Sequence, residues 1–162
     1  MNCEICTFED VLPIWNNDLW PNRISKIESR SALFWDVNEW TNFNNVSIIK
    51  KRKEIWEYEP TFFCIRDNNK IIGVNSGFRT EDRVYRSRGL YVNNLYRNQG
   101  LAKKLLNGAV EQGKREECSW IWSLPRKTAI EVYGGVGFIK VGNWIDEGLE
   151  FGPNCLAVLK LL

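Results

Sequence analysis

The sequence predicts a mixed α/β fold, with a mostly antiparallel sheet and helices on both faces of it. Three apolar runs rich in strand formers, at 61–66, 71–79 and 84–92, are separated by short turns and predict an antiparallel meander. The last run leads through a glycine loop into a helix, and another strand-like run follows at 118–124. Because a strand–helix–strand unit needs a crossover, these last two strands are expected to be parallel. The chain length suits one domain, expected over 1–162.

The N-terminal part begins with a weakly alternating run at 2–7, which predicts a first strand. Apolar residues then recur at helical spacing over 9–20. Thr7 and Asp10 are both candidates for the helix cap, and Pro21 ends the helix.

Residues 22–45 are the least readable part, because aromatic side chains alternate there with serines and asparagines. Such a segment is expected to line a groove; its aromatic residues are Phe34, Trp35, Trp40 and Phe43. The charged run 50–59 suits either a helix or an extended linker.

The helix after the glycine loop is expected over 100–112, with Gly113 as its C-terminal stop. The expected elements after 118–124 are a helix over 128–136 capped by Thr128, a strand over 137–141, an acidic turn over 143–153 and a strand over 156–162.

The composition excludes several classes of protein. The net charge is only +2, with both signs spread along the chain, so nucleic acid is not an expected partner. The N-terminus has acids and no basic segment, and no apolar run is long enough to span a bilayer. We therefore expect a cytoplasmic protein without a membrane partner.

The cysteine and histidine counts restrict the chemistry further. An odd number of cysteines, five in all, suggests reduced thiols. Cys3 and Cys6 could form a metal or redox pair, but alternation on an edge strand explains their spacing better. With no histidine in the chain, Ser-His-Asp and Cys-His machinery are excluded, and no metal is expected. A general base must be a carboxylate, Lys, Tyr, Cys or water.

The stretch 90–106 indicates an anion site. A short strand end gives way to a loop containing Gly100, and apolar residues then recur at helical spacing. The first N–H groups of a helix lack intrahelical partners, and a glycine lets a phosphate approach the backbone. Arg97, Lys103 and Lys104 add positive charge at the rim. The alternative is an ordinary strand–helix turn that happens to contain glycine.

Two segments resemble signatures of the GNAT superfamily, the acetyl-CoA-dependent N-acetyltransferases. Arg97-x-x-Gly100-x-Ala102 is similar to the pyrophosphate-binding motif, with Val92 at the strand position five residues before the arginine. The downstream segment 129–138 is similar to the family's Ala-x-x-x-Tyr-x-x-x-Gly-Phe pattern. The resemblance implies a GNAT-like (acyl-CoA N-acyltransferase) fold and acetyl-CoA as co-substrate.

The resemblance also implies where acetyl-CoA binds. The backbone of the helix start would hold the pyrophosphate, and the strand before it would hold the pantetheine arm through unpaired backbone groups. Arg126 stands where the family often has Asn, and it could pair with a phosphate instead. The expected cofactor-binding residues are Leu90, Tyr91, Val92, Arg97, Asn98, Gln99, Gly100, Leu101, Ala102 and Arg126.

Tyr133 matches the family tyrosine that donates a proton to the departing thiolate, a role that suits a phenol protonated at neutral pH. The alternative is a half-buried tyrosine that merely packs on Phe138. The general base is left open; the candidates are Glu81, Asp82, Asp146, Glu147 and a bound water.

The expected function is transfer of an acetyl group from acetyl-CoA to a primary amine, by direct attack in a ternary complex. A catalytically silent module that binds CoA or a partner through an aromatic groove is the main alternative, and an acceptor amine on a macromolecule is a weaker one. A homodimer is compatible with the sequence.

Overall fold

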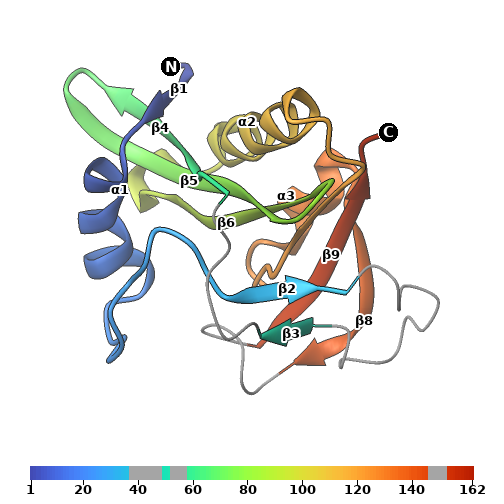
Figure 1. The fold of residues 1–162 in the computed structure, drawn as a ribbon. Coiled ribbons are helices and arrows are strands. Elements are labelled where there is room, and N and C mark those ends of the chain that lie inside the picture. Colours follow the sequence, from blue (N-terminus) through green and yellow to red (C-terminus); the bar gives the residue numbers. More distant parts are fainter. Residues whose placement is uncertain (37–48, 52–57, 146–152) are drawn as a thin grey trace.

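In a computed structural model that describes residues 1–36, 49–51, 58–145 and 153–162, the chain forms a seven-stranded sheet (Figure 1). In their order across the sheet, the strands are β1 (Cys3–Cys6), β4 (Thr61–Asp67), β5 (Lys70–Glu81), β6 (Val84–Val92), β7 (Trp120–Ser123), β9 (Asn154–Lys160) and β8 (Ile139–Ile145). Among the described pairs only β6 and β7 are parallel, as the crossover predicts. A separate antiparallel ribbon joins β2 (Leu33–Trp35) to β3 (Ile49–Lys51).

Helices cover both faces of this sheet. Figure 1 shows α2 (Leu101–Arg115) and α3 (Ile130–Val136) on one side and α1 (Phe8–Ile14) on the other. Side chains alternate along β4 accordingly: Phe63 and Ile65 pack in the core under α2, whereas Phe62 and Cys64 pack with α1. The predicted fold class is confirmed. None of the helices among the described residues is long and apolar enough to cross a bilayer.

The meander and the first helix start are confirmed closely. The Thr7 hydroxyl accepts a hydrogen bond from the Asp10 N–H, and the Asp10 carboxylate accepts one from the Thr7 N–H, which completes a capping box. The predicted helix over 9–20 is divided, because α1 passes at Trp15 into a π-helical turn, Trp15–Leu19. Cys3 and Cys6 lie on edge strand β1 and pack with the cores on opposite faces of the sheet.

Two of the predicted helix boundaries are wrong. Gly113 does not stop α2, which continues to Arg115. A Cβ at Gly113 would lie 3.3 Å from Tyr85, so the missing side chain permits close packing on the sheet. Thr128 does not cap α3, whose first cap residue is Ala129 without a side-chain hydrogen bond. The chain enters α3 through a backbone turn in which the Ala129 N–H donates to the Arg126 carbonyl.

The predicted aromatic groove is wrong for Trp35, whereas Phe34 is half-buried and its place in a groove stays a prediction. Trp35 is fully buried and meets Trp120 edge-on, so it belongs to the core. Trp40 and Phe43 lie outside the described residues, as do Asp146, Glu147 and most of the predicted acidic turn. The start of that turn, at 143–145, is instead the end of strand β8.

Candidate active site

The site begins where β6 and β7 part. The two strands pair over three positions only, Val84 with Trp120, Tyr85 with Ile121 and Arg86 with Trp122. The last link is the Ser123 hydroxyl, which donates to the Ser87 carbonyl over 2.7 Å. The end of β6, Leu90–Val92, has β5 on one side, and no described strand pairs with its other side. Its backbone edge is therefore open toward a cavity.

A β-bulge at Gly89 sets the direction in which this strand edge faces. Val74 pairs with Tyr91 but Ser76 pairs with Arg88, so two residues of β6 face the single residue Asn75. Gly89 has a φ of +83°, and the indole of Trp15 donates to its carbonyl over 2.8 Å. A Cβ on Gly89 would lie 2.4 Å from three atoms of that indole, so the approach requires glycine.

The bulge also changes which side chains face which layer. Before it, Tyr85 packs in the α2 core; after it, Leu90 and Val92 do, and Tyr91 packs with the α1 cluster. Without the extra residue, the alternation along β6 would place Tyr91 under α2.

The loop from β6 to α2 is shaped by backbone conformation. Asn98 and Gly100 are both left-handed, with φ of +64° and +77°, and α2 begins at Leu101 without an acidic residue in its first turn. Apart from its two chain neighbours, no described residue has an atom within 4 Å of a Cβ placed at Gly100, so the helix start is open to a ligand on this side. Arg97 is folded back, with its Nε donating to the Val92 carbonyl over 3.0 Å. Its guanidinium lies 5.6 Å from the ring centre of Tyr91.

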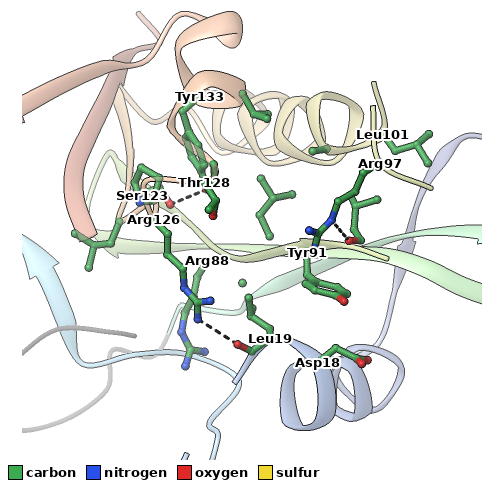
Figure 2. Close-up of a pocket in the computed structure, with 18 of the residues that line it drawn as sticks. Asp18, Leu19, Arg88, Tyr91, Arg97, Leu101, Ser123, Arg126, Thr128 and Tyr133 are labelled. Atoms are coloured by element: carbon green, nitrogen blue, oxygen red, sulfur yellow. Dashed lines mark hydrogen bonds between the residues drawn. The ribbon is translucent and has the colours of Figure 1, made fainter. Parts of the chain in front are cut away.

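These elements enclose a cavity of about 550 Å³ (Figure 2). The predicted site residues that line it are Leu90, Tyr91, Val92, Arg97, Asn98, Leu101, Ala102, Arg126 and Tyr133. Gln99 and Gly100 are exposed in the adjoining loop and are not part of the wall.

The position of Tyr133 follows from the end of α3. The Phe138 N–H donates to the Tyr133 carbonyl and the Gly137 N–H donates to the Gly134 carbonyl, a Schellman motif with Gly137 at a φ of +113°. This turn folds Phe138 back edge-on against the Tyr133 ring, 5.2 Å between centres. The Tyr-x-x-x-Gly-Phe spacing therefore places a helix C-cap at Gly137 and packs Phe138 against the tyrosine ring.

The Tyr133 phenol is buried and lies 3.1 Å from the Ser123 hydroxyl, as the dashed line in Figure 2 shows. Burial raises the pKa of Tyr133, and hydrogen bonding with Ser123 and Ser87 and the charge of Arg86 partly oppose that rise. The phenol is therefore protonated at neutral pH.

Arginines line the other end of the cavity. Arg86 and Arg88 are 2% and 3% exposed, and their guanidinium groups lie over Trp122 and over Trp15 and Trp20, respectively. The Arg126 side chain donates to the Leu19 carbonyl over 3.1 Å and, in Figure 2, extends away from Arg97 and the start of α2.

The candidate bases Glu81 and Asp82 lie at the opposite end of the β5–β6 hairpin and do not line the cavity. The carboxylate that does line it, among the described residues, is the exposed Asp18.

Sequence reasoning missed Gly89, Ser123 and the two buried arginines. A glycine inside a predicted strand was a signal for the bulge. Arg86 and Arg88 share one strand face by their spacing. Ser123 had no comparable signal.

Comparisons with known proteins agree with this fold. The family model of the acetyltransferase (GNAT) family matches residues 29–138, more than half of the chain. No curated protein sequence matches. An acetyltransferase of the GNAT family from Staphylococcus aureus Mu50 superposes with a TM-score of 0.62 at 16% identity, covering 99% of each chain. A Lactobacillus plantarum protein proposed to be an N-acetyltransferase gives 0.65 at 15% identity over 100% of each chain.

The Salmonella typhimurium protein yncA, solved with its cofactor acetyl-CoA, gives a TM-score of 0.54 at 18% identity. That match covers 63% of this chain and 65% of the other. The strand parting, the open helix start and the clamped tyrosine thus occur in a chain whose sequence matches the family model. The chain belongs to the acetyltransferase (GNAT) family.

Proposed function

We propose that this protein transfers an acetyl group from acetyl-CoA to a primary amine by direct attack in a ternary complex. The observation that carries the proposal is the cavity itself. It joins an unpaired strand edge, an open helix start and a buried phenol that is protonated at neutral pH.

The donor site would use backbone more than side chains. Helix-start N–H groups from Asn98 to Ala102 carry partial positive charge and would hold the pyrophosphate. The open edge at Leu90, Tyr91 and Val92 would hydrogen-bond the amides of the pantetheine arm, as a peptide adds to a sheet. The Arg97 side chain could turn from the Val92 carbonyl to a phosphate.

Arg126 supports a revised assignment. Its guanidinium donates to the Leu19 carbonyl, away from the helix start. We therefore propose that Arg126 shapes the acceptor end of the cavity by holding the end of the π-helical turn, rather than pairing with the pyrophosphate.

Acetyl-CoA would supply the acetyl thioester. The amine nitrogen bonds to the carbonyl carbon, the carbon–sulfur bond breaks, and Tyr133 gives its proton to the departing sulfur. The proton that the amine loses passes to water or a base and, in sum, replaces the proton that Tyr133 gave. Since Asp18 is the carboxylate that lines the cavity among the described residues, a water near it is the base that we favour over Glu81 and Asp82.

A thermal-shift titration with acetyl-CoA and with CoA tests the donor site. Ligand binding to the folded state raises the melting temperature, by an amount that grows with ligand concentration over Kd. We expect Gly100→Glu to lose this shift, because its carboxylate would stand where the pyrophosphate binds. Gly135→Glu adds the same charge at an exposed helical position with nothing within 4 Å, and it should keep the shift.

Gly100 is left-handed, so any side chain there is strained whatever its charge. Gly100→Asn controls for that strain, because Asn tolerates this conformation. If Gly100→Glu binds acetyl-CoA as well as Gly100→Asn does, the helix start is not the pyrophosphate site.

Release of CoA thiol across a panel of amines tests the reaction. Tyr133→Phe should keep ligand binding and lower kcat by about a hundredfold or more, the range for loss of a general acid. A protein that binds CoA but releases no thiol with any amine would be the silent binding module.

We infer a cytoplasmic location, because the five cysteines form no disulfide and three of them are buried, which suits a reducing compartment. A homodimer stays a prediction, which the mass of the protein in solution would test. An acceptor amine on a protein or other macromolecule would appear as a substrate in the same thiol assay.

A further inference from the structure

A line of buried polar groups runs behind the Tyr133 phenol, from the cavity wall into the sheet. The phenol oxygen lies 3.1 Å from the Ser123 hydroxyl, which donates to the Ser87 carbonyl over 2.7 Å. The Ser87 hydroxyl in turn is engaged with Asn75, as acceptor from its amide nitrogen at 2.9 Å and as donor to its amide oxygen at 3.1 Å. Asn75 is fixed by a further bond to the Leu105 carbonyl. All of these side chains are buried.

The hydrogens in this line can be assigned by counting. A carbonyl oxygen only accepts, so the single hydroxyl hydrogen of Ser123 is used on Ser87. The hydrogen between Ser123 and Tyr133 must therefore come from Tyr133. In the resting protein the phenol proton points into the wall at Ser123, not at the cavity.

For Tyr133 to give its proton to a departing sulfur, the phenol hydrogen has to rotate away from Ser123. The Ser123 oxygen then loses its donor, and the phenolate that forms needs one. The Ser123 hydroxyl can become that donor if its hydrogen turns from the Ser87 carbonyl to the phenolate oxygen, which lies 3.1 Å from the Ser123 oxygen. Hydrogen bonds to a charged acceptor are stronger than those to a neutral carbonyl, so the turn is favoured only after the proton has left.

We propose that Ser123 is a positioning residue that holds the Tyr133 proton at rest and then turns its own hydrogen to the phenolate. The inference rests on the proposed role of Tyr133 as proton donor. In proton balance, the O–H bond of Tyr133 breaks, the S–H bond of the leaving thiol forms, and Ser123 keeps its proton throughout. Asn75 holds Ser87 in place, because the Ser87 hydroxyl gives its hydrogen to the Asn75 amide oxygen and accepts one from the Asn75 amide nitrogen. The Ser87 hydroxyl is a second polar neighbour of the Tyr133 phenol.

The decisive measurement needs neither acetyl-CoA nor an acceptor. Tyr133 is replaced by 3-fluorotyrosine, whose phenol titrates at lower pH than tyrosine, and its ionisation is followed by fluorine NMR. In Ser123→Ala the phenolate loses its donor, so the titration midpoint should rise by about 1 pH unit or more. Ser87→Ala removes the second hydroxyl near the phenol but leaves the backbone carbonyl and Ser123 in place, so it should raise the midpoint less than Ser123→Ala does.

Ser123→Thr and Ser123→Val form a matched pair, nearly equal in shape and different in the hydroxyl. The threonine variant should titrate close to the parent and the valine variant should titrate with Ser123→Ala. This pair decides the question if the alanine variant does not fold. Equal midpoints for threonine and valine would overturn the proposal.

The acetyl-transfer assay separates this proposal from the proposed function. Ser123→Ala should lower kcat about tenfold with KM for acetyl-CoA unchanged, and it should have no further effect in a Tyr133→Phe background. An unchanged kcat in Tyr133→Phe would remove Tyr133 from the reaction, while the NMR midpoints would still report whether Ser123 stabilises the phenolate. A Ser123→Ala effect that persists in Tyr133→Phe would show that Ser123 acts elsewhere and contradict the proposal.

Discussion

Replacing Gly89 by alanine tests whether the bulge that opens β6 toward the cavity depends on its contact with Trp15. The new Cβ would lie 2.4 Å from three indole atoms, far inside van der Waals contact. Trp15 cannot easily move away, because it is fully buried and packs against the rings of Phe8, Trp20 and Phe62. Gly89→Ala should therefore destabilise the protein strongly.

The expected loss has three parts. A left-handed alanine costs about 1–2 kcal/mol, overpacking of a full core typically costs about 1–3 kcal/mol, and the displaced indole loses a hydrogen bond worth about 1 kcal/mol. Together these lower the free energy of unfolding by about 4 kcal/mol. For a chain of this size that lowers the melting temperature by about 8–16 °C.

Urea unfolding followed by far-ultraviolet circular dichroism measures the loss. Gly135→Ala is the matched control, since Gly135 lies in exposed helix with nothing within 4 Å, and it should gain up to about 1 kcal/mol. In a Trp15→Phe background the smaller ring leaves room, so Gly89→Ala should cost only about 1–2 kcal/mol there, the conformational part. A loss below about 1 kcal/mol in the parent protein would refute the reasoning.

Three further predictions concern the rest of the chain. Thr7→Ala removes a helix cap and should lower the free energy of unfolding by about 1 kcal/mol, measured in urea; no change would mean that the capping box contributes nothing. Hydrogen bonds from Thr7 hold the pKa of Asp10 below its ordinary value. The stability that the Asp10 carboxylate contributes is therefore complete above about pH 4 and is lost as the pH falls through the pKa of the folded state. The stability difference between the parent and Asp10→Ala should therefore shrink from neutral pH toward about pH 2, and a constant difference would contradict this. Burial raises the pKa of Cys118 and Cys155 to about 11, so a thiol reagent at about pH 8 should react slowly with these two thiols in the native protein. In denaturant the same reagent should modify all five cysteines quickly. Fast native reaction of all five would show that the core opens readily.

Much of the candidate site could be predicted because its signals are local. The cap at Thr7 depends on groups three residues apart, and the left-handed Gly100 stands directly before the helix that it starts. The Tyr-x-x-x-Gly-Phe spacing encodes a helix stop within six residues. Backbone geometry and short-range hydrogen bonds determine such caps and helix stops, so these features form largely independently of the rest of the fold.

The features that were missed depend on contacts between distant segments. Gly113 looked like a helix stop, but packing of α2 on Tyr85 keeps it inside the helix. The Gly89 bulge is held by Trp15, 74 positions away along the chain. Ser123 meets Tyr133 only because β7 ends where β6 begins to part from it.

The sequence by itself therefore determined the order of the elements, the glycine loop that starts α2 and the helix stop that holds Tyr133 against Phe138. Only the tertiary structure decided which of these share a cavity, which strand edge stays open and where the phenol proton points at rest. The physical reason is that periodicity and turn chemistry act over a few residues. The parting of two strands and the direction of a buried hydrogen bond are set instead by packing among segments far apart in the chain.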